Sequence, residues 1–244
     1  MKERAGVAES VYAAVSKAAG PRPCGFESHL RHMRQTQASH AAVTGERAPG
    51  LVGEPGLYAS YAYVLGMYLG DGCISRTGRT ERLRVTLDSA YPGVIEECRR
   101  AVGDLMPGHA VSIVKRRDRA VDVSCYSILW PQLLPQHGPG RKHERRIELT
   151  GWQERIVRAE PKPFLRGLFH ADGSYFVNRV TSSAGRTYCY DRYFFTNESA
   201  EIKELFRWAC DIIGVETRLA GRRNVSVARR SSVAILNTFL GPKR

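Results

Sequence analysis

The sequence contains two short stretches of the same design, about a hundred residues apart. Residues 64–72 read Val-Leu-Gly-Met-Tyr-Leu-Gly-Asp-Gly, and residues 165–173 read Leu-Arg-Gly-Leu-Phe-His-Ala-Asp-Gly. Each is an apolar run with a small residue at its third and seventh places, and each ends in Asp-Gly. The two aspartates, Asp71 and Asp172, are 101 residues apart. The pattern predicts two equivalent helices that pack together and that each deliver one carboxylate.

The small residues within each stretch lie four places apart, and therefore on one face of a helix. They are Gly66, Gly70, Gly167 and Ala171. Because a glycine inside a helix costs about 0.5–1 kcal/mol relative to alanine, we expect a close helix–helix contact at these positions to offset that cost. Gly72 and Gly173 follow the predicted helix ends, and we expect them in the left-handed conformation that is common there.

Asp71 and Asp172 are poorly placed for stability alone. A carboxylate at a helix C-terminus meets the negative end of the helix dipole, and two carboxylates brought together raise the pKa of at least one of them. A bound divalent cation would reverse both penalties. Mg²⁺ suits such a site, since it is held by one or two carboxylates together with water and substrate phosphates. We therefore predict that both aspartates bind Mg²⁺ or another divalent cation such as Mn²⁺.

The charge of the chain points to a polyanionic partner. The 37 Lys and Arg residues exceed the 24 Asp and Glu residues, which gives a formal net charge of +13. The six cysteines form no Cys-x-x-Cys pair, which argues against a zinc ribbon or a thioredoxin-like site. No apolar run reaches the roughly 18 residues of a membrane span. We expect a cytoplasmic, nucleic-acid-associated protein without a membrane partner.

Residues 57–160 and residues 161–244 repeat one order of predicted elements: helix, hairpin, helix, hairpin, helix. The clearest strand, residues 82–88, alternates Leu83, Val85 and Leu87 with polar residues. The predicted helices cover residues 57–70, 93–105, 128–134, 147–157, 164–171, 199–213 and 232–240. The predicted strands cover residues 73–76, 82–88, 110–116, 120–126, 174–180, 187–196, 216–220 and 225–229. We expect two homologous halves that form a pseudo-dimer.

Residues 1–56 differ from the rest of the chain. They are rich in Ala, Gly, Pro, Ser and His and show almost no periodicity beyond one short predicted helix. We expect this segment to be a disordered tail, or to lie upstream of the true start of the protein.

The second stretch matches the motif that names the LAGLIDADG homing endonucleases at six of its nine places, and the first keeps Gly66, Asp71 and Gly72. From residue 57 onward, the chain resembles a single-chain member of that family with two motifs. The resemblance implies an α+β fold of two αββαββα halves related by a pseudo-twofold axis. The motif helices would form the interface, and two antiparallel sheets would form a DNA-binding saddle. It also implies a monomer that acts as a pseudo-dimer on double-stranded DNA with a long target site.

The resemblance further implies a site-specific, metal-dependent cut of both DNA strands, with Asp71 and Asp172 as the catalytic, metal-binding acids. The preceding residues, Gly70 and Ala171, would belong to the metal site. A basic residue near each acid would support the transition state. The candidates are Lys115 or Arg116 in the first half and Arg222 or Arg223 in the second. The residues expected to contact DNA are Arg76, Arg82, Arg84, Lys115, Arg116, Arg117, Arg179, Arg192, Arg222, Arg223, Arg229 and Arg230.

Two departures bear on the resemblance. His170 and Leu69 stand at the sixth place of the motif, where an acidic residue is common, so we expect the packing of the interface to differ. The alternative function is a non-catalytic nucleic-acid binder of the same fold, either an intron maturase or a transcription regulator. Both aspartates are retained, which favours the nuclease.

Overall fold

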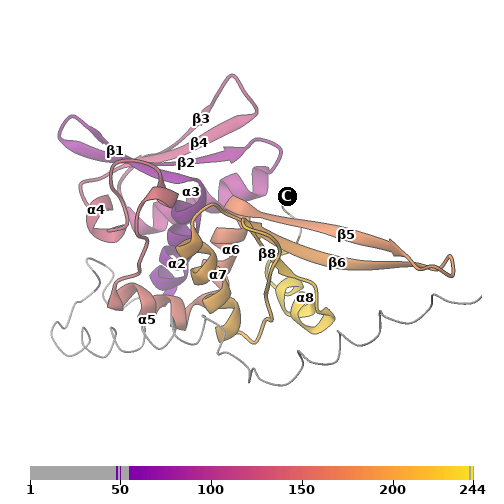
Figure 1. The fold of residues 1–244 in the computed structure, drawn as a ribbon. Helices are drawn as coiled ribbons and strands as arrows, with labels where there is room; N and C mark the ends of the chain where they lie inside the picture. The colour runs from indigo at the N-terminus through magenta and orange to yellow at the C-terminus, as the bar shows by residue number, and fades with distance from the viewer. Residues whose placement is uncertain (1–47, 49, 51–54, 242, 244) are drawn as a thin grey trace, which may run out of the picture. The chain divides into compact units, whose positions relative to one another are not determined.

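A computed structural model describes residues 48, 50, 55–241 and 243 (Figure 1). Almost all of the tail of residues 1–56 lies outside the described residues. The elements of the first half are α2 (Pro55–Asp71), β1 (Gly72–Thr77), β2 (Thr80–Asp88), α3 (Pro92–Leu105), β3 (Val111–Lys115), β4 (Ala120–Tyr126), α4 (Trp130–Leu133), the 3₁₀ turn η1 (Lys142–Glu144) and α5 (Gly151–Ala159). None of the helices in this described part of the chain is long and apolar enough to cross a membrane.

The second half repeats the order of the first. Its elements are α6 (Pro161–Asp172), β5 (Gly173–Thr181), β6 (Thr187–Thr196), α7 (Ala200–Ile212), β7 (Arg218–Leu219), β8 (Asn224–Val227) and α8 (Arg230–Asn237). Each half carries one four-stranded antiparallel sheet, in the orders β1-β2-β4-β3 and β5-β6-β8-β7. The predicted α+β class with two αββαββα halves is confirmed.

One predicted helix begins later than expected. The sequence predicted a helix over residues 147–157, but α5 begins at Gly151, after Thr150. The side chain of Gln153 reaches back to the backbone N–H of Thr150 at 2.9 Å, which forms half of a capping box. Ile147 is 2% exposed and therefore belongs to the core without being helical. Its burial produced the apolar signal that extended the predicted helix.

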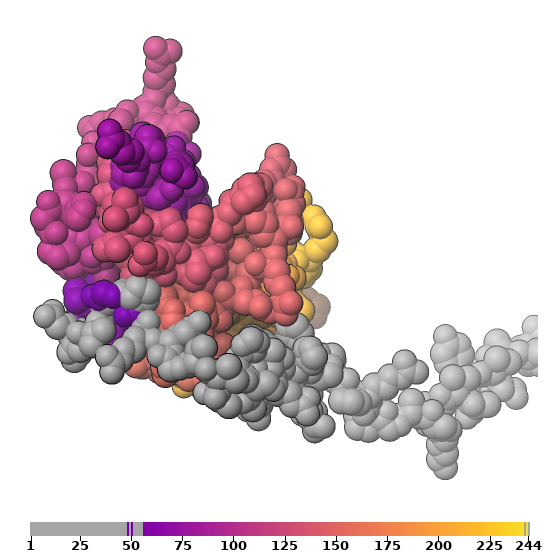
Figure 2. Space-filling model, turned by 90° about the vertical axis from the view of Figure 1, so that its left-hand side faces the viewer, coloured from indigo at the N-terminus to yellow at the C-terminus, as the bar shows by residue number. Residues whose placement is uncertain are grey.

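Each sheet has an inner face on the helices and an outer face turned away from them. On β2, Leu83, Val85 and Leu87 are buried against α2, while Arg82 and Arg84 alternate with them on the outer face. This is the alternation that the sequence predicted for residues 82–88. The outer face of the first sheet is therefore its polar surface. Figure 2 shows a hollow between the indigo-to-magenta first half and the orange-red part of the second half.

Helices α2 and α6 pack backbone against backbone in the middle of the molecule (Figure 1). A Cβ atom on Gly66 would lie 2.5 Å from the carbonyl oxygen of Phe164, and one on Gly167 would overlap the carbonyl oxygen of Tyr63. A Cβ atom on Gly70 would overlap that of Ala171. The small residues therefore let the two helices approach each other more closely than any larger side chain would permit.

The glycines that follow the motif helices serve a different purpose from the one predicted. Gly173 has φ −89° and ψ 154°, which is extended backbone, and Gly72 also lacks a positive φ. The predicted left-handed conformation is wrong, because each strand begins directly after its helix. What requires glycine is space: a Cβ atom on Gly72 would lie 2.5 Å from Cα of Tyr68, and one on Gly173 would overlap the ring of Phe169.

A polar cluster joins the halves beside this contact. Arg166 of α6 donates from Nε and Nη2 to the two carboxylate oxygens of Glu97 on α3, at 2.5 and 2.8 Å. His170 of α6 is 5% exposed, and a 2.9 Å hydrogen bond joins its Nδ1 to the hydroxyl of Tyr63. Burial lowers the pKa of His170 to about 4, so the ring is neutral at pH 7. His170 therefore packs as a neutral core residue at the sixth place of the second motif.

Candidate active site

Asp71 and Asp172 lie at the C-terminal ends of α2 and α6, where the two helices meet. A Cβ atom on Gly70 would lie only 2.9 Å from Oδ2 of Asp172, which shows how closely the second carboxylate approaches the first motif. Asp71 retains an exposed side chain, and Asp172 is half-buried. The structure thus brings together the two carboxylates that lie 101 residues apart in the sequence.

The pKa of Asp71 is raised to about 6. The main cause is desolvation of the carboxyl group by burial, although the residue as a whole is exposed. The negative charge of Asp172 raises the pKa further, while Lys142 and Lys243 lower it. The surroundings of Asp71 therefore disfavour its ionised form. The repulsion from Asp172 that the sequence predicted contributes, but desolvation is the larger cause.

Asp172 has a polar partner that Asp71 lacks among the interactions of the described residues. The side-chain amide of Asn197 donates from Nδ2 to Oδ2 of Asp172 at 2.7 Å. Burial raises the pKa of Asp172, and this hydrogen bond opposes the rise. Asn197 directly follows β6, so the second sheet fixes the orientation of the second carboxylate. The two aspartates are therefore equivalent in position but not in environment.

Lys142, in the loop after α4, caps the end of the first motif helix. Its Nζ donates to the carbonyl oxygens of Gly70 at 2.7 Å and Gly72 at 2.8 Å, and also to that of Tyr68. An ammonium group has three donors, and all three are used here: two on carbonyl groups of the last turn of α2 and one on the first residue of β1. Burial lowers the pKa of Lys142 to about 8, although the nearby aspartates act in the opposite direction.

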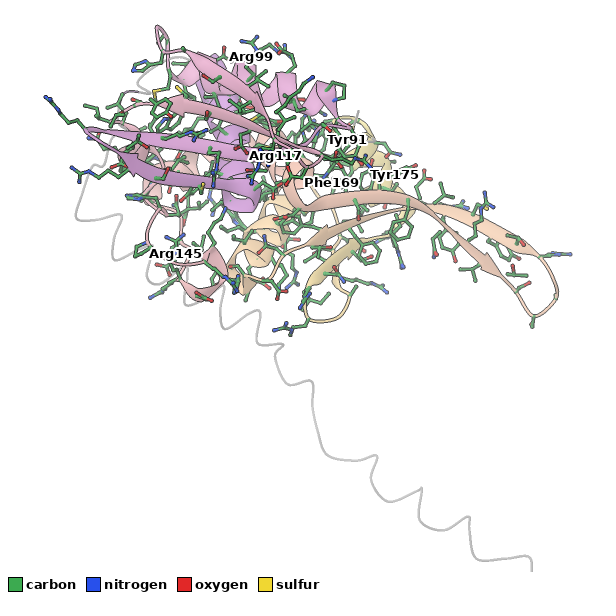
Figure 3. All side chains as sticks on the ribbon, turned by 90° about the horizontal axis from the view of Figure 1, so that it is seen from above. Tyr91, Arg99, Arg117, Arg145, Phe169 and Tyr175 are labelled. Atoms are coloured by element: carbon green, nitrogen blue, oxygen red, sulfur yellow. The ribbon has the colours of Figure 1, made fainter. Side chains whose placement is uncertain are left out.

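Lys243 takes the equivalent place in the second half. Its Nζ donates to the carbonyl oxygen of Ala171 at 3.1 Å, and it lies 6.0 Å from the ring centroid of Tyr91 and 5.7 Å from that of Phe169. Tyr91 and Phe169 are labelled in Figure 3, where the two halves meet. Burial lowers the pKa of Lys243, and Asp71 and Asp172 oppose this effect.

Lys142 and Lys243 are 101 residues apart, the same separation as the aspartates. Each follows the last helix of its half's αββαββα pattern, and each binds the carbonyl oxygen of the residue before its own aspartate. Neither lysine was predicted as a site residue from the sequence. A signal was present, because both lysines closely follow a Gly-Pro pair, at residues 138–139 and 241–242.

Comparison with known proteins supports the architecture. No protein-family model and no curated protein matches the chain. Mesophilic variants of the homing endonuclease I-DmoI align with 16% identity over 77% of this chain and 97% of their own, with a TM-score of 0.50. The LAGLIDADG meganuclease I-AabMI bound to uncleaved DNA aligns with 16% identity over 73% and 82%, at a TM-score of 0.47. Full-length DUF199/WhiA from Thermatoga maritima aligns with 15% identity over 80% of this chain and 59% of its own, with a TM-score of 0.49.

The chain has the fold of the single-chain LAGLIDADG homing endonucleases. At this level of identity the likeness concerns the fold, so the roles of individual residues rest on their geometry in this chain.

Within this LAGLIDADG fold, the lysines that bond to the carbonyl groups beside the aspartates are Lys142 and Lys243, which are not among the four candidates from the sequence. Lys115 ends β3 at the edge of the first sheet and is exposed. Arg222 lies in the turn between β7 and β8, also exposed, with Nη2 3.3 Å from Oε2 of Glu198. Instead, the segments that follow α4 and α8 bring Lys142 and Lys243 to the site. The path of these segments could not be predicted from the positions of the strands.

Three of the predicted DNA-contacting arginines are distinguished by their surroundings. Arg82, Arg84 and Arg192 lie half-buried on the strands, and the Nε of each is buried without a hydrogen-bond partner among the described residues. An unpaired buried donor is costly, so a shift of these side chains that let the donor bind a ligand would be favourable. All three belong to the outer faces of the sheets.

The other predicted DNA-contacting arginines are exposed at turns, strand ends or along the β5–β6 hairpin. They are Arg76, Arg116, Arg117, Arg179, Arg223, Arg229 and Arg230. Arg116, Arg223 and Arg229 form ion pairs with Asp122, Glu198 and Glu216. Arg179 pairs in register with Cys189 and lies on the inner side of its hairpin, away from the outer face.

Proposed function

We propose that this protein is a divalent-metal-dependent, site-specific endonuclease that cuts both strands of double-stranded DNA. The observation that carries the proposal is the doubled arrangement at the helix contact. Each half supplies one aspartate and one lysine, and the two pairs have the same separation in the sequence. Two equivalent sets of groups suit a substrate with two strands.

The donor set fits a hard divalent cation. The carboxylates of Asp71 and Asp172, with the carbonyl groups of Gly70 and Ala171, offer only oxygen. In the described part of the chain, no group of three or more His, Cys, Asp or Glu side chains is placed to hold a metal. Two aspartates leave most ligand positions for water and substrate phosphate, which is typical of Mg²⁺ sites. When bound, the cation would activate water and stabilise the leaving oxygen.

The remaining roles fall to residues of the chain itself. The lysine ammonium groups lie beside the aspartates, where they would stabilise negative charge that develops on a phosphate. Asn197 would keep the Asp172 carboxylate oriented. The outer faces, with their unpaired arginine donors and the net charge of +13, would bind the phosphate backbone and the base edges. Each sheet would thus hold one half of the target site.

The proposal is tested by incubating the full chain and Mg²⁺ with a library of double-stranded DNA sites that includes its own genomic insertion locus. The wild-type protein is expected to cleave selected members. The Asp71→Asn/Asp172→Asn double variant is expected to bind the same members without cutting them. Undiminished cutting by the double variant would overturn the assignment of the site. Binding without cutting by the wild-type protein would favour the non-catalytic alternative.

A further inference from the structure

The two outer faces differ in chemistry at positions that correspond to each other. The first residues of β1 and β5 pair with Val85 and Phe195, respectively. Arg84 directly precedes Val85, and Phe194 directly precedes Phe195, so both side chains point to the outer face of their sheets. By the same register, Arg82 corresponds to Arg192. The position of Arg82 and Arg192 therefore holds the same residue in both halves, whereas the neighbouring position holds Arg84 in one half and Phe194 in the other.

The first outer face is polar around Arg84. Its partners in register are Cys73 on β1 and Ser124 on β4. Arg82 donates from Nη2 to Oγ of Ser124 at 3.2 Å, whereas Nε of Arg84 has no protein partner among the described residues. Arg84 thus presents an unpaired guanidinium donor on a surface of small polar side chains.

The second outer face is aromatic at the corresponding place. Phe194 stacks on Phe176 of β5, with ring centroids 5.3 Å apart and planes 19° apart. Phe176 is 41% exposed, although the inner face of the same hairpin already carries the tilted ring pair Tyr175–Tyr193. Arg192 lies over Phe194, 5.5 Å from its centroid. A positively charged group therefore borders an aromatic pair of which Phe176 is exposed and Phe194 is half-buried.

The apolar surface continues outward along the hairpin. Val180 and Tyr188 pair in register on the same face and are 42% and 51% exposed. β6 pairs with β8 only over residues 193–196, so this part of the hairpin is a two-stranded ribbon that extends beyond the sheet (Figures 1 and 3). Exposed apolar side chains on such a ribbon indicate a surface that contacts a ligand.

These side chains recognise different bases in the major groove. An arginine pairs with O6 and N7 of guanine, whereas an apolar side chain contacts the methyl group of thymine. We propose a base assignment at one pair of positions equidistant from the centre of the DNA target: the base facing Arg84 is guanine, and the base facing the Phe176–Phe194 pair is thymine. This inference rests on the proposed endonuclease function, which places the outer faces on DNA. The two DNA positions that face Arg82 and Arg192 are expected to prefer the same base.

The test is selection of bound duplexes from a randomised library by the full-length Asp71→Asn/Asp172→Asn variant, which retains target DNA uncut. The enriched site is expected to carry guanine and thymine at one pair of positions equidistant from its centre. Adding Phe194→Arg is expected to change that thymine to guanine, with a discrimination of about five- to hundredfold. Phe194→Leu is expected to retain thymine, and Arg119→Ala, in the β3–β4 turn, is the matched control.

The outcomes separate this inference from the proposed function. If DNA is enriched but Phe194→Arg leaves the base preference of the unchanged Phe194, or Phe194→Leu loses the thymine, this base assignment is overturned while the DNA-binding function stands. If no duplex is enriched above the input library, both are overturned. The readout is a base preference at one position, so a general loss of affinity or stability does not imitate the expected change.

Discussion

Lys142 and Lys243 make the same bond in the two halves: each donates from Nζ to the carbonyl oxygen that precedes the local aspartate, at 2.7 and 3.1 Å. Both hold a positive charge against the negative end of a motif helix and beside Asp71 and Asp172. The cations and the carboxylates are thus arranged as one repeated unit, and the following expectations depend on it.

Lys142→Met and Lys243→Met are each expected to slow cleavage on the order of a hundredfold, because each removes one positive charge from the reacting phosphate. Single-turnover rates, measured strand by strand at saturating protein, check this expectation. Lys115→Met is the matched control, since Lys115 is exposed on an edge strand and is expected to alter affinity only. A rate loss for Lys115→Met equal to that of the other two would contradict the placement of the lysines.

The raised pKa of Asp71 makes the metal-free protein sensitive to pH. Between pH 3.8 and about 6 the folded protein holds a proton on Asp71 that the unfolded chain releases. The free energy of unfolding therefore falls as pH rises through this range. Asp71→Asn removes the effect, so this variant is expected to gain stability over wild type above about pH 6 and to lose the gain below about pH 4.

Thermal unfolding in chelator across this pH range is the measurement. Adding Mg²⁺ at pH 7 is expected to raise the Tm of the wild-type protein but not that of Asp71→Asn/Asp172→Asn, since the cation binds only the folded, ionised site. If the Tm of the wild-type protein and that of Asp71→Asn changed with pH in parallel, the pKa of Asp71 would be the same in the folded and unfolded states, contrary to this expectation.

The sequence predicted the architecture and the placement of Asp71 and Asp172 at the meeting ends of two helices because both depend on local patterns. Alternation along β2, small residues four apart and Asp-Gly at each helix end are visible without tertiary information. The lysines were missed because their approach depends on the path of two loops. The conformation of Gly173 was predicted wrongly because its requirement is the nearby ring of Phe169, a contact that no local rule describes.

Gly167→Ala is expected to lower the free energy of unfolding by about 1–3 kcal/mol, because the Cβ of the alanine would overlap the carbonyl oxygen of Tyr63 across the helix contact. Gly103→Ala is the matched control. Gly103 also lies in a helix, but a Cβ there would meet only Val111 at 3.8 Å. That change is expected to stabilise the protein by about 0.5–1 kcal/mol. Chemical denaturation of both variants measures the difference, and equal effects would exclude close packing as the reason for Gly167.

Arg166→Leu is expected to cost about 2 kcal/mol of stability, because it leaves Glu97 without its paired donors. Arg166 also donates from Nη1 to the carbonyl oxygens of Phe239 and Leu240, in the segment that leads to Lys243. Cleavage of the strand served by the second half is therefore expected to slow as well. Denaturation and single-turnover rates measure the two effects, and a stability loss without a rate loss would separate Arg166 from the active site.

The central claim is that each half supplies the carboxylate needed to cut one strand. The most direct measurement is cleavage of a supercoiled plasmid that carries the selected site, with the nicked strand mapped by sequencing. The wild-type protein is predicted to linearise the plasmid. Asp71→Asn and Asp172→Asn are each predicted to stall at nicked circles, and the double variant is predicted to leave the plasmid supercoiled. Linearisation by both single variants at the wild-type rate would contradict the account.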